Sequence, residues 1–508
     1  STLFPYTTLF RSFMVAKKVQ IDTLSYKKEA TSVRWICEGG TEYEMGDSDS
    51  RETRGTTITL FLDDESKEFL EYYKVRGIIE KYCSFLPTEI FLINVDEEKK
   101  KSEEDKDKDG EPTPLNDTNP LWLKKPSECT DEEYKEFYKQ VFNEYEDPLF
   151  WIHLNVDYPF NLKGILYFPK LKNEFELIEG KVKLYNNQVF VADNIKEVIP
   201  EFLLLLKGAI DCPDLPLNVS RSFLQNDRDV SRISKHIVKK VADKLNSIFN
   251  IDRDKFDEFW DDIHLFIKFG CLKDESFYEK IKDIIVFKNI EGKHITLKDY
   301  LDNAKEKHEN KVFYVSNEEE QSQYIKLFKE YGLDAVILSS PIDNNFISFL
   351  EYKDGNVKFT RVDSDLSDVL KDKDAEENKE NNEKIIELFK SVIGDKMKEY
   401  KVESLKNEKT PAMVLLSEYS RRMAEMQAQF GGIGMNIPEE KSLVINGNNP
   451  IIKKLVSISD DESKKDKVNM ICKQIVDLAL ISNKSLNSDE LDEFINRSND
   501  LMLQVMDI

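Results

Sequence analysis

The chain has 508 residues, which is too long for a single hydrophobic core and predicts two to four domains. It carries 97 acidic and 73 basic residues, a net charge of −24, and such a surface disfavours nucleic acid and anionic lipid as partners. No apolar run approaches the roughly 18–20 residues that a membrane-spanning helix needs. We therefore expect a soluble protein with no nucleic-acid or membrane partner.

Cysteine and histidine are spread thinly along the chain. The five histidines form no pair with metal-ligand spacing, and no two cysteines form a C-x-x-C pair. Reduced thiols in a cytoplasmic protein, with no metal site, are therefore expected. The six cysteines are Cys37, Cys83, Cys129, Cys212, Cys271 and Cys472.

The first twelve residues differ in character from the rest of the chain. Residues 1–12 lack the basic and continuous apolar parts of a signal peptide, and residues 2–12 resemble a translated sequencing adaptor. We expect these residues to be an artefact fused just before Phe13, with a genuine N-terminal strand as the alternative.

Residues 13–95 are rich in predicted strands. Ile58–Leu62 alternates with period two after a turn at Gly55, and a helix-like stretch extends from Lys67 to Tyr82. Residues 96–111 are almost wholly charged, so they cannot bury a face and should form a linker.

Strands and helices then recur between residues 118 and 370. Thr130 followed by acidic residues predicts a helix start. Strands are expected over residues 164–169, 181–185 and 188–192, the last two joined by a turn at Asn186-Asn187. An apolar stripe from Ile233 to Ile248 predicts a long helix, and residues 312–359 read as a small α/β unit.

A second charged tract, residues 363–387, precedes a final region that starts near Lys384. Its last two helices carry apolar stripes, from Val468 to Leu478 and from Leu491 to Val505. Two amphipathic helices at a chain end need a partner surface, and a homodimer through these C-terminal helices is expected. Docking onto their own domain is the alternative.

Several motifs in one order resemble the ninety-kilodalton heat-shock chaperones, especially the bacterial form found in Bacteroidetes. The motif of residues 214–225 resembles the catalytic loop of that family, and Glu52–Thr56 resembles a late strand of its ATPase domain. The other matching stretches are residues 81–87, 119–122, 133–138, 147–150, 150–160 and 164–169.

The resemblance implies an α+β multidomain fold. Residues 13–95 would be the C-terminal remnant of a GHKL ATPase α/β sandwich, and 96–117 a charged linker. Residues 118–370 would be an α/β middle domain, and 371–508 a mostly helical C-terminal domain that binds clients and dimerises.

The resemblance also implies site residues. Arg221 matches an arginine that reaches the γ-phosphate, where a permanently charged guanidinium stabilises the transferring phosphoryl group. Asn218 and Gln225 match positions that orient this arginine, and Thr56 matches a threonine that helps to hold the adenine. The family's cofactor is ATP with Mg²⁺, but its general base and magnesium ligand come from a stretch that we expect to lie before Phe13. We therefore predict no measurable ATP turnover from residues 1–508.

We expect a methionine-rich stretch to bind the client proteins. Met423, Met426 and Phe430 recur at near-helical spacing before a glycine-rich run, and flexible methionine side chains adapt to many apolar partners. The alternative is a helix of the core. Tyr145, Phe150 and Trp151 could extend the client surface, although aromatic core residues would look the same.

Two functions are therefore expected. The first is an ATP-dependent molecular chaperone that binds and remodels partly folded client proteins, in protein folding and the stress response. The alternative is a non-catalytic dimeric client-binding module.

Overall fold

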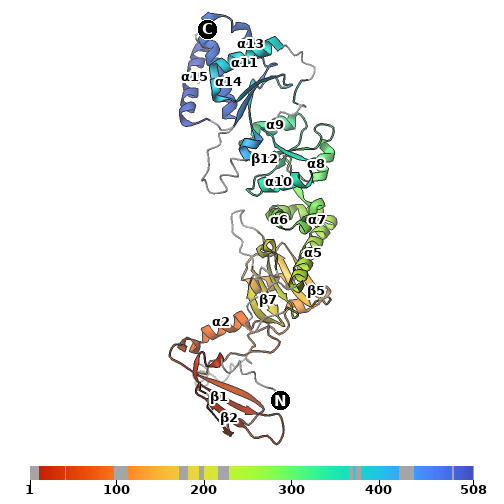
Figure 1. Ribbon diagram of the computed structural model, residues 1–508, viewed down its shortest axis with the longest axis vertical. Coiled ribbons are helices and arrows are strands. Elements are labelled where there is room, and N and C mark those ends of the chain that lie inside the picture. Colours follow the sequence, from red (N-terminus) through yellow and green to blue (C-terminus); the bar gives the residue numbers. More distant parts are fainter. Residues whose placement is uncertain are drawn as a thin grey trace.

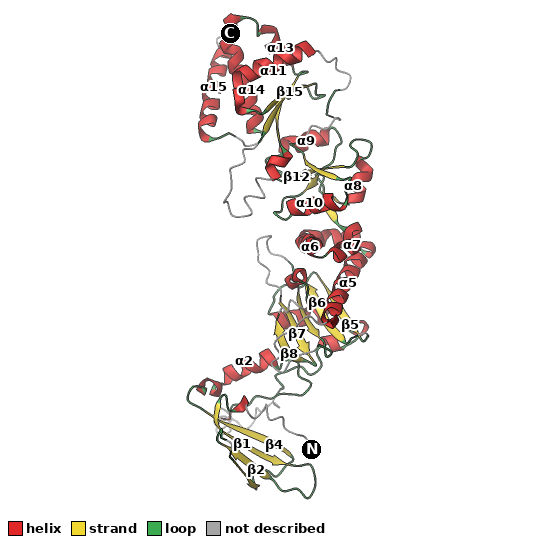
Figure 2. Ribbon diagram, viewed as in Figure 1, coloured by secondary structure: helices red, strands yellow, loops and turns green. Residues whose placement is uncertain are grey.

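The computed structural model describes a mixed α/β protein whose elements follow one another along its longest axis (Figure 1). Figure 2 shows that strands dominate the N-terminal part and helices the C-terminal part. In the described ranges, no helix is long and apolar enough to cross a membrane. These ranges are residues 11–40, 42–95, 113–158, 160–170, 181–193, 199–215, 228–364, 370–372, 379–422, 440–482 and 486–506.

The first sheet is antiparallel, in the order β3-β2-β1-β4. Its strands are β1 (Ala16–Leu24), β2 (Val33–Cys37), β3 (Tyr43–Asp47) and β4 (Gly55–Leu62). Central β1 buries Ala16 and Val19, whereas every residue of β3 is exposed. The 3₁₀ turn η1 (Lys67–Leu70) and helix α2 (Tyr72–Tyr82) come next, and neither buries a residue.

The second sheet has five strands in the order β5-β6-β9-β7-β8. They are β5 (Phe150–Val156), β6 (Leu162–Phe168), β7 (Lys181–Asn186), β8 (Val189–Asp193) and β9 (Lys207–Asp211). Neighbouring residues of β6, such as Ile165 and Leu166, belong to different apolar clusters, because successive side chains point to opposite faces. Both faces of this sheet are therefore covered.

One face packs against an aromatic cluster that includes Phe85, Trp122, Tyr134 and Tyr138. Besides Phe85, these residues lie on the 3₁₀ turn η2 (Leu121–Leu123) and on helix α4 (Asp131–Phe142), and the short turn η3 (Pro126–Glu128) connects the two. The other face packs against α5 (Arg228–Ile251), α6 (Arg253–Lys273) and α7 (Glu275–Ile281), with the turn η4 (Glu201–Leu205) beside them.

A small α/β unit comes next. After the turn η5 (Lys282–Ile284), the antiparallel pair β10 (Val286–Lys288) and β11 (His294–Thr296) leads into helix α8 (Leu297–Ala304). The later elements of the unit are β12 (Lys311–Val315), α9 (Ser322–Glu330), β13 (Val336–Ile337), α10 (Asp343–Lys353) and β14 (Lys358–Arg361). Their three strands form a parallel sheet in the order β13-β12-β14.

The C-terminal part combines helices with a three-stranded sheet in the order β15-β17-β16. Its elements are α11 (Lys379–Ile393), η6 (Gly394–Lys396), β15 (Glu399–Glu403), β16 (Ala412–Leu416), β17 (Lys441–Asn446), α13 (Pro450–Ile458), η7 (Glu462–Lys464), α14 (Lys465–Ile481) and α15 (Ser488–Met506). Strand β17 pairs in parallel with β15 and antiparallel with β16. Phe313 and Phe328 of the α/β unit share one apolar cluster with Met413 and Val444, so the two parts pack together.

Most of the predicted elements are confirmed. Residues 58–62 lie in β4, the turn at Asn186-Asn187 joins β7 to β8, and the stripe from Ile233 lies on α5. Thr130 caps α4: its hydroxyl oxygen accepts from the Glu133 backbone N–H at 3.3 Å, and the Glu133 carboxylate accepts from the Thr130 N–H at 2.9 Å.

Three details differ from the prediction. The helix over residues 67–82 is broken, because Glu71 is extended between η1 and α2. Helix α11 begins at Lys379, inside the second charged tract, since Ile385 and Phe389 give it a buried face. The C-terminal sheet was not predicted.

Residues 96–112 of the predicted linker lie outside the described residues. The end of the linker is held in place, because the Asn116 side chain accepts from the Ile90 N–H and donates to the carbonyls of Leu86 and Thr88.

Candidate functional site

Thr56 is the predicted nucleotide-binding residue that the structure describes. It lies on β4 opposite Thr23 of β1, and the two hydroxyl oxygens are 2.9 Å apart. Both hydroxyls are exposed; β4 is an edge strand of the sheet, whereas β1 lies between β2 and β4. Thr23 Oγ1 also donates to the Gly55 carbonyl at 3.4 Å, so the two threonines join the start of β4 to the end of β1.

A polar cluster beside Thr23 was missed by the sequence reasoning. The buried Asp22 carboxylate accepts from Arg34 Nε at 2.6 Å, Gln20 Nε2 at 2.7 Å and Ser50 Oγ at 2.7 Å. The hydrogen bond from Gln20, followed by that from Arg34, lowers the pKa of Asp22 to about 2. The cluster ties β1, β2 and the turn after β3 together.

The predicted catalytic residues Asn218, Arg221 and Gln225 lie outside the described residues, but the chain that leads to them is described as far as Leu215. The Cys212 N–H donates to the Tyr185 carbonyl at 3.0 Å. The Asn186 side-chain amide donates to the carbonyls of Cys212 and Pro213, each at 3.1 Å. Asp214 accepts from the Asn161 N–H at 2.6 Å. The start of the predicted catalytic loop is therefore held by side chains and backbone of the five-stranded sheet.

Asp211, the last residue of β9, is 4% exposed. Its Oδ2 accepts from the Gln188 N–H at 2.9 Å, in the β7–β8 turn where Asn187 and Gln188 both have positive φ. Burial raises the pKa of Asp211 above its ordinary value. A cavity of about 190 Å³ opens beside it, lined by Leu123, Asn161, Lys163, Asn187, Gln188, Asp211 and Pro213.

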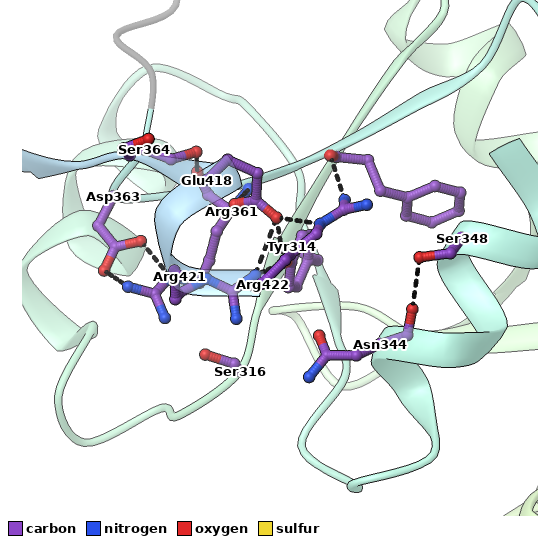
Figure 3. Close-up of polar contacts among 12 residues, drawn as sticks. Tyr314, Ser316, Asn344, Ser348, Arg361, Asp363, Ser364, Glu418, Arg421 and Arg422 are labelled. Carbon is purple, nitrogen blue, oxygen red and sulfur yellow. Dashed lines mark hydrogen bonds and ion pairs between the residues drawn. The ribbon is translucent and has the colours of Figure 1, made fainter. Parts of the chain in front are cut away.

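The predicted client-binding residues Met423, Met426 and Phe430 also lie outside the described residues, but the helical residues 418–422 that lead to them are described. Figure 3 shows that these residues meet polar side chains of the α/β unit. Tyr314 Oη donates to Glu418 Oε1 at 2.6 Å, and Arg422 Nη1 donates to Glu351 Oε2 at 2.8 Å. No motif in the sequence pointed to this cluster.

The three aromatic residues considered for the client surface have different surroundings. Phe150 is 5% exposed and stacks on Phe168, so it is a core residue. Trp151 is partly buried and stacks on Tyr134, whereas Tyr145 is 96% exposed.

The last two helices have opposite characters. Helix α14 buries Val468, Cys472 and Ile475 in the C-terminal core, whereas α15 has no buried residue. Polar contacts join them: Arg497 pairs with Asp477, and Gln474 Nε2 donates to Ser498 Oγ at 2.9 Å. Phe494 and Leu501 of α15 are half-buried, whereas its other apolar side chains are exposed, namely Leu491, Ile495, Met502, Leu503, Val505 and Met506.

A larger cavity of about 360 Å³ lies between α6 and the small α/β unit. The buried ion pair of Lys268 and Asp343, 2.5 Å apart, forms part of its wall. Asp343 also accepts from the Ser340 N–H at 3.0 Å, so the pair fixes the start of α10 to α6. In the part of the chain that the structure describes, no group of three or more His, Cys, Asp or Glu residues could hold a metal ion.

Comparisons with known proteins identify the family. The family model described as Hsp90 protein matches residues 94–508. The chain is 38% identical to the chaperone protein HtpG of Bacteroides thetaiotaomicron, over 97% of this chain and 83% of that protein. It is 38% identical to the HtpG of Porphyromonas gingivalis over 95% of this chain and 72% of that protein. It is 30% identical to the HtpG of Buchnera aphidicola over 97% of this chain and 79% of that protein. The chain therefore belongs to the Hsp90 family, as its motifs predicted.

Proposed function

We propose that the protein is an ATP-dependent molecular chaperone that binds partly folded client proteins in the cytoplasm. The observation that carries this proposal is the likeness to HtpG chaperones over 97% of the chain, at 38% identity. The held start of the predicted catalytic loop supports it, because Asn186 and Asn161 fix the chain just before the motif of residues 214–225.

The proposed domain layout follows the sequence prediction: an ATPase part over residues 13–95, a middle domain over 118–370 and a C-terminal domain over 371–508. The five-stranded sheet, the helices α5–α7 and the parallel sheet would belong to the middle domain. The exposed apolar face of α15 supports the proposed homodimer, because such a face is stabilised when a second copy covers it.

Four residues would serve the nucleotide. Thr56 would contact the adenine, Arg221 the γ-phosphate, and Asn218 and Gln225 would orient Arg221. Bound ATP with Mg²⁺ would supply the free energy for client release. Thr56 is the only one of these four residues in the described part of the chain, and its hydroxyl meets Thr23. The described residues alone therefore do not complete a nucleotide pocket.

A client assay tests the proposal. Purified protein should reduce light scattering by heat-denatured citrate synthase without nucleotide, and a variant with Met423, Met426 and Phe430 replaced by Ser should lose this effect while melting at the same temperature. The control is Lys239→Ala, an exposed position on α5. Wild-type protection by the triple variant would contradict the proposed client site.

The same assay with and without ATP tests the ATP dependence. The family function predicts that ATP increases the yield of refolded citrate synthase and that Arg221→Ala abolishes the increase. The sequence prediction of no turnover by residues 1–508 implies no increase. Equal yields of refolded citrate synthase with and without ATP would therefore mean that this chain binds clients without using ATP.

A further inference from the structure

The cavity of about 360 Å³ between α6 and the small α/β unit lies at the carboxyl end of a parallel strand. Ile337 ends β13, and residues 337–340 line the cavity. In α/β sheets, ligands bind outside the carboxyl ends of the strands. The volume also falls within the range of about 300–1,000 Å³ that is typical of small-molecule sites. Position and size therefore both make this cavity a candidate binding site.

One part of the cavity wall is apolar and buried. Trp260 of α6 is 4% exposed, and Val286 and Phe287 of β10 are buried as well. Trp260, His264 and Lys268 follow one another at a spacing of four residues, so they lie on the same face of α6 and all line the cavity. A ligand that fills this part needs an apolar body, because a polar group there would lose its hydrogen bonds with water.

The polar end of the cavity is the buried ion pair of Lys268 and Asp343. Both side chains are 5% exposed, and the Lys268 Nζ lies 2.5 Å from the Asp343 Oδ1. The Asp343 Oδ2 accepts from the Ser340 N–H at 3.0 Å. An ammonium group has three N–H donors, and within the described residues the Asp343 Oδ1 is the one acceptor of Lys268. Two donors of Lys268 and a second lone pair on each Asp343 oxygen therefore remain for a ligand.

The charges at this end are balanced, which disfavours a charged ligand. Lys268 and Asp343 neutralise each other. Burial, followed by the charge of Lys268, lowers the pKa of His264 to about 3, so the imidazole is neutral at pH 7. A charge added beside a balanced, buried pair would be desolvated without a counter-charge. The other charged residues of the lining are exposed to water, namely Asp261, Lys288 and Glu318.

We propose that this cavity binds a small neutral molecule in which an amide group is joined to an apolar ring. The amide carbonyl accepts from the Lys268 Nζ, the amide N–H donates to Asp343, and the ring packs against Trp260 and Phe287. An amide presents an acceptor and a donor side by side and carries no charge, so it complements both members of the ion pair. The site goes beyond the proposed function, because its occupation is measured without clients or ATP.

Three isosteric probes of different charge test the ligand class: neutral para-fluorobenzamide, anionic para-fluorobenzoate and cationic para-fluorobenzamidine. Each is titrated with the full chain and followed by fluorine NMR line widths. We expect the amide to bind with a Kd on the order of 1 mM, as small fragments do, and each charged isostere to bind at least about tenfold more weakly. Tighter binding of either charged isostere, or no binding of the amide, would overturn the proposal.

Two variants test whether the amide occupies this cavity. Ser339 is exposed and lines the cavity, so Ser339→Trp places a bulky side chain there and leaves the ion pair intact. It should weaken amide binding about tenfold at an unchanged Tm. Lys268→Met/Asp343→Asn removes both charges together, which avoids an unpaired buried charge, and should also weaken amide binding about tenfold.

A matched control is a second buried ion pair, between Arg361 and Asp363, whose Nε and Oδ1 are 2.5 Å apart and which does not line the cavity. Arg361→Met/Asp363→Asn should leave the Kd for the amide unchanged. If a variant of either ion pair did not fold, Ser339→Trp alone would decide. Wild-type affinity of Ser339→Trp for the amide would show that the probe binds elsewhere, and the proposal would be wrong.

Discussion

The four-stranded sheet β3-β2-β1-β4 and the five-stranded sheet β5-β6-β9-β7-β8 use similar strand-forming residues but are covered very differently. In the first, Ile58 and Leu60 of β4 are 50% and 40% exposed. In the second, Ile165 and Leu166 of β6 are 0% exposed because aromatic residues cover one face and helices the other. An alternating pattern therefore predicts a strand, but the stability of that strand comes from what packs on it.

The buried carboxylates of the two sheets show the same contrast in electrostatics. Three side-chain donors surround Asp22, and its pKa falls to about 2. Asp211 Oδ2 accepts from the backbone N–H of Gln188, and burial raises the pKa of this carboxyl. The first carboxylate stabilises its sheet as an anion, whereas burial makes the anionic form of the second less favourable.

The largest expected effect concerns the covered sheet. Trp122 is 0% exposed, with ring centroids 4.6 Å from Phe85 and 5.1 Å from Tyr185. Trp122→Ala should lower the free energy of unfolding by about 3–5 kcal/mol through lost contacts and a cavity. The control is Trp35→Ala on partly exposed β2, with an expected loss of about 1 kcal/mol. Urea unfolding followed by circular dichroism measures both losses, and equal losses would show that the covering of the five-stranded sheet adds no stability.

Two glycines, one in each sheet, differ in the space around them. A Cβ at Gly164 of β6 would lie 2.5 Å from the Ala209 carbonyl oxygen, whereas a Cβ at Gly46 of β3 would meet nothing within 4 Å. Gly164→Ala should cost about 1–3 kcal/mol, because the clash is with backbone that cannot move aside. Gly46→Ala should be neutral or slightly stabilising. Thermal melts of both variants check this, and a neutral Gly164→Ala would show that the strands can separate.

The two carboxylates should respond to pH in opposite directions. The folded pKa of Asp22 lies below the unfolded value of 3.8, so its stabilisation is complete above about pH 4 and is lost as the pH falls toward 2. The raised pKa of Asp211 means that its burial penalty is relieved as the pH falls.

Asp22→Asn should therefore cost about 2 kcal/mol at pH 7, whereas Asp211→Asn should cost little or stabilise. Hydrogen exchange of peptides from β1 and from β9 reports each sheet separately. If Asp211→Asn accelerated exchange in β9 more than Asp22→Asn accelerates it in β1, each relative to the wild type, the stabilising role given to the Asp22 anion would be contradicted.

The smallest effect is expected for Leu60→Ser on the exposed face of β4. It should change the free energy of unfolding by less than about 0.5 kcal/mol and reduce self-association, because it removes exposed apolar surface. Leu166→Ser in β6 is the matched substitution at a buried position and should cost several kcal/mol. Analytical ultracentrifugation and denaturant melts test the pair.

Much of the fold could be predicted because local signals were strong. Thr130 with Glu133 three residues later marks the start of α4, and Asn186-Asn187 supplies the positive φ that the β7–β8 turn needs at Asn187. The alternation of strands and helices over residues 312–359 predicted the small α/β unit, and the structure adds that its strands β13, β12 and β14 pair in parallel.

The remaining features depend on residues distant in sequence. Nothing near Glu418 in sequence reveals that Tyr314 lies 2.6 Å away, and nothing near Asp22 reveals Arg34 and Ser50. Strand β15 pairs with β17 rather than with β16, its neighbour along the chain, so local pattern could not predict that sheet. The predicted site residues came from family motifs, and of them only Thr56 falls among the described residues.

The pairing of β16 with β17 has a consequence for protein engineering. Leu416 and Lys441 are direct partners across this antiparallel pair, so their Cα atoms lie about 4.5–5.5 Å apart although residues 417–440 separate them in sequence. The whole stretch is therefore an excursion between two adjacent anchor points. Residues 418–422 of this stretch bind Tyr314 and Glu351 of the α/β unit, so an exchange with the corresponding stretch of a related protein should begin after Arg422 to keep that contact and the strands.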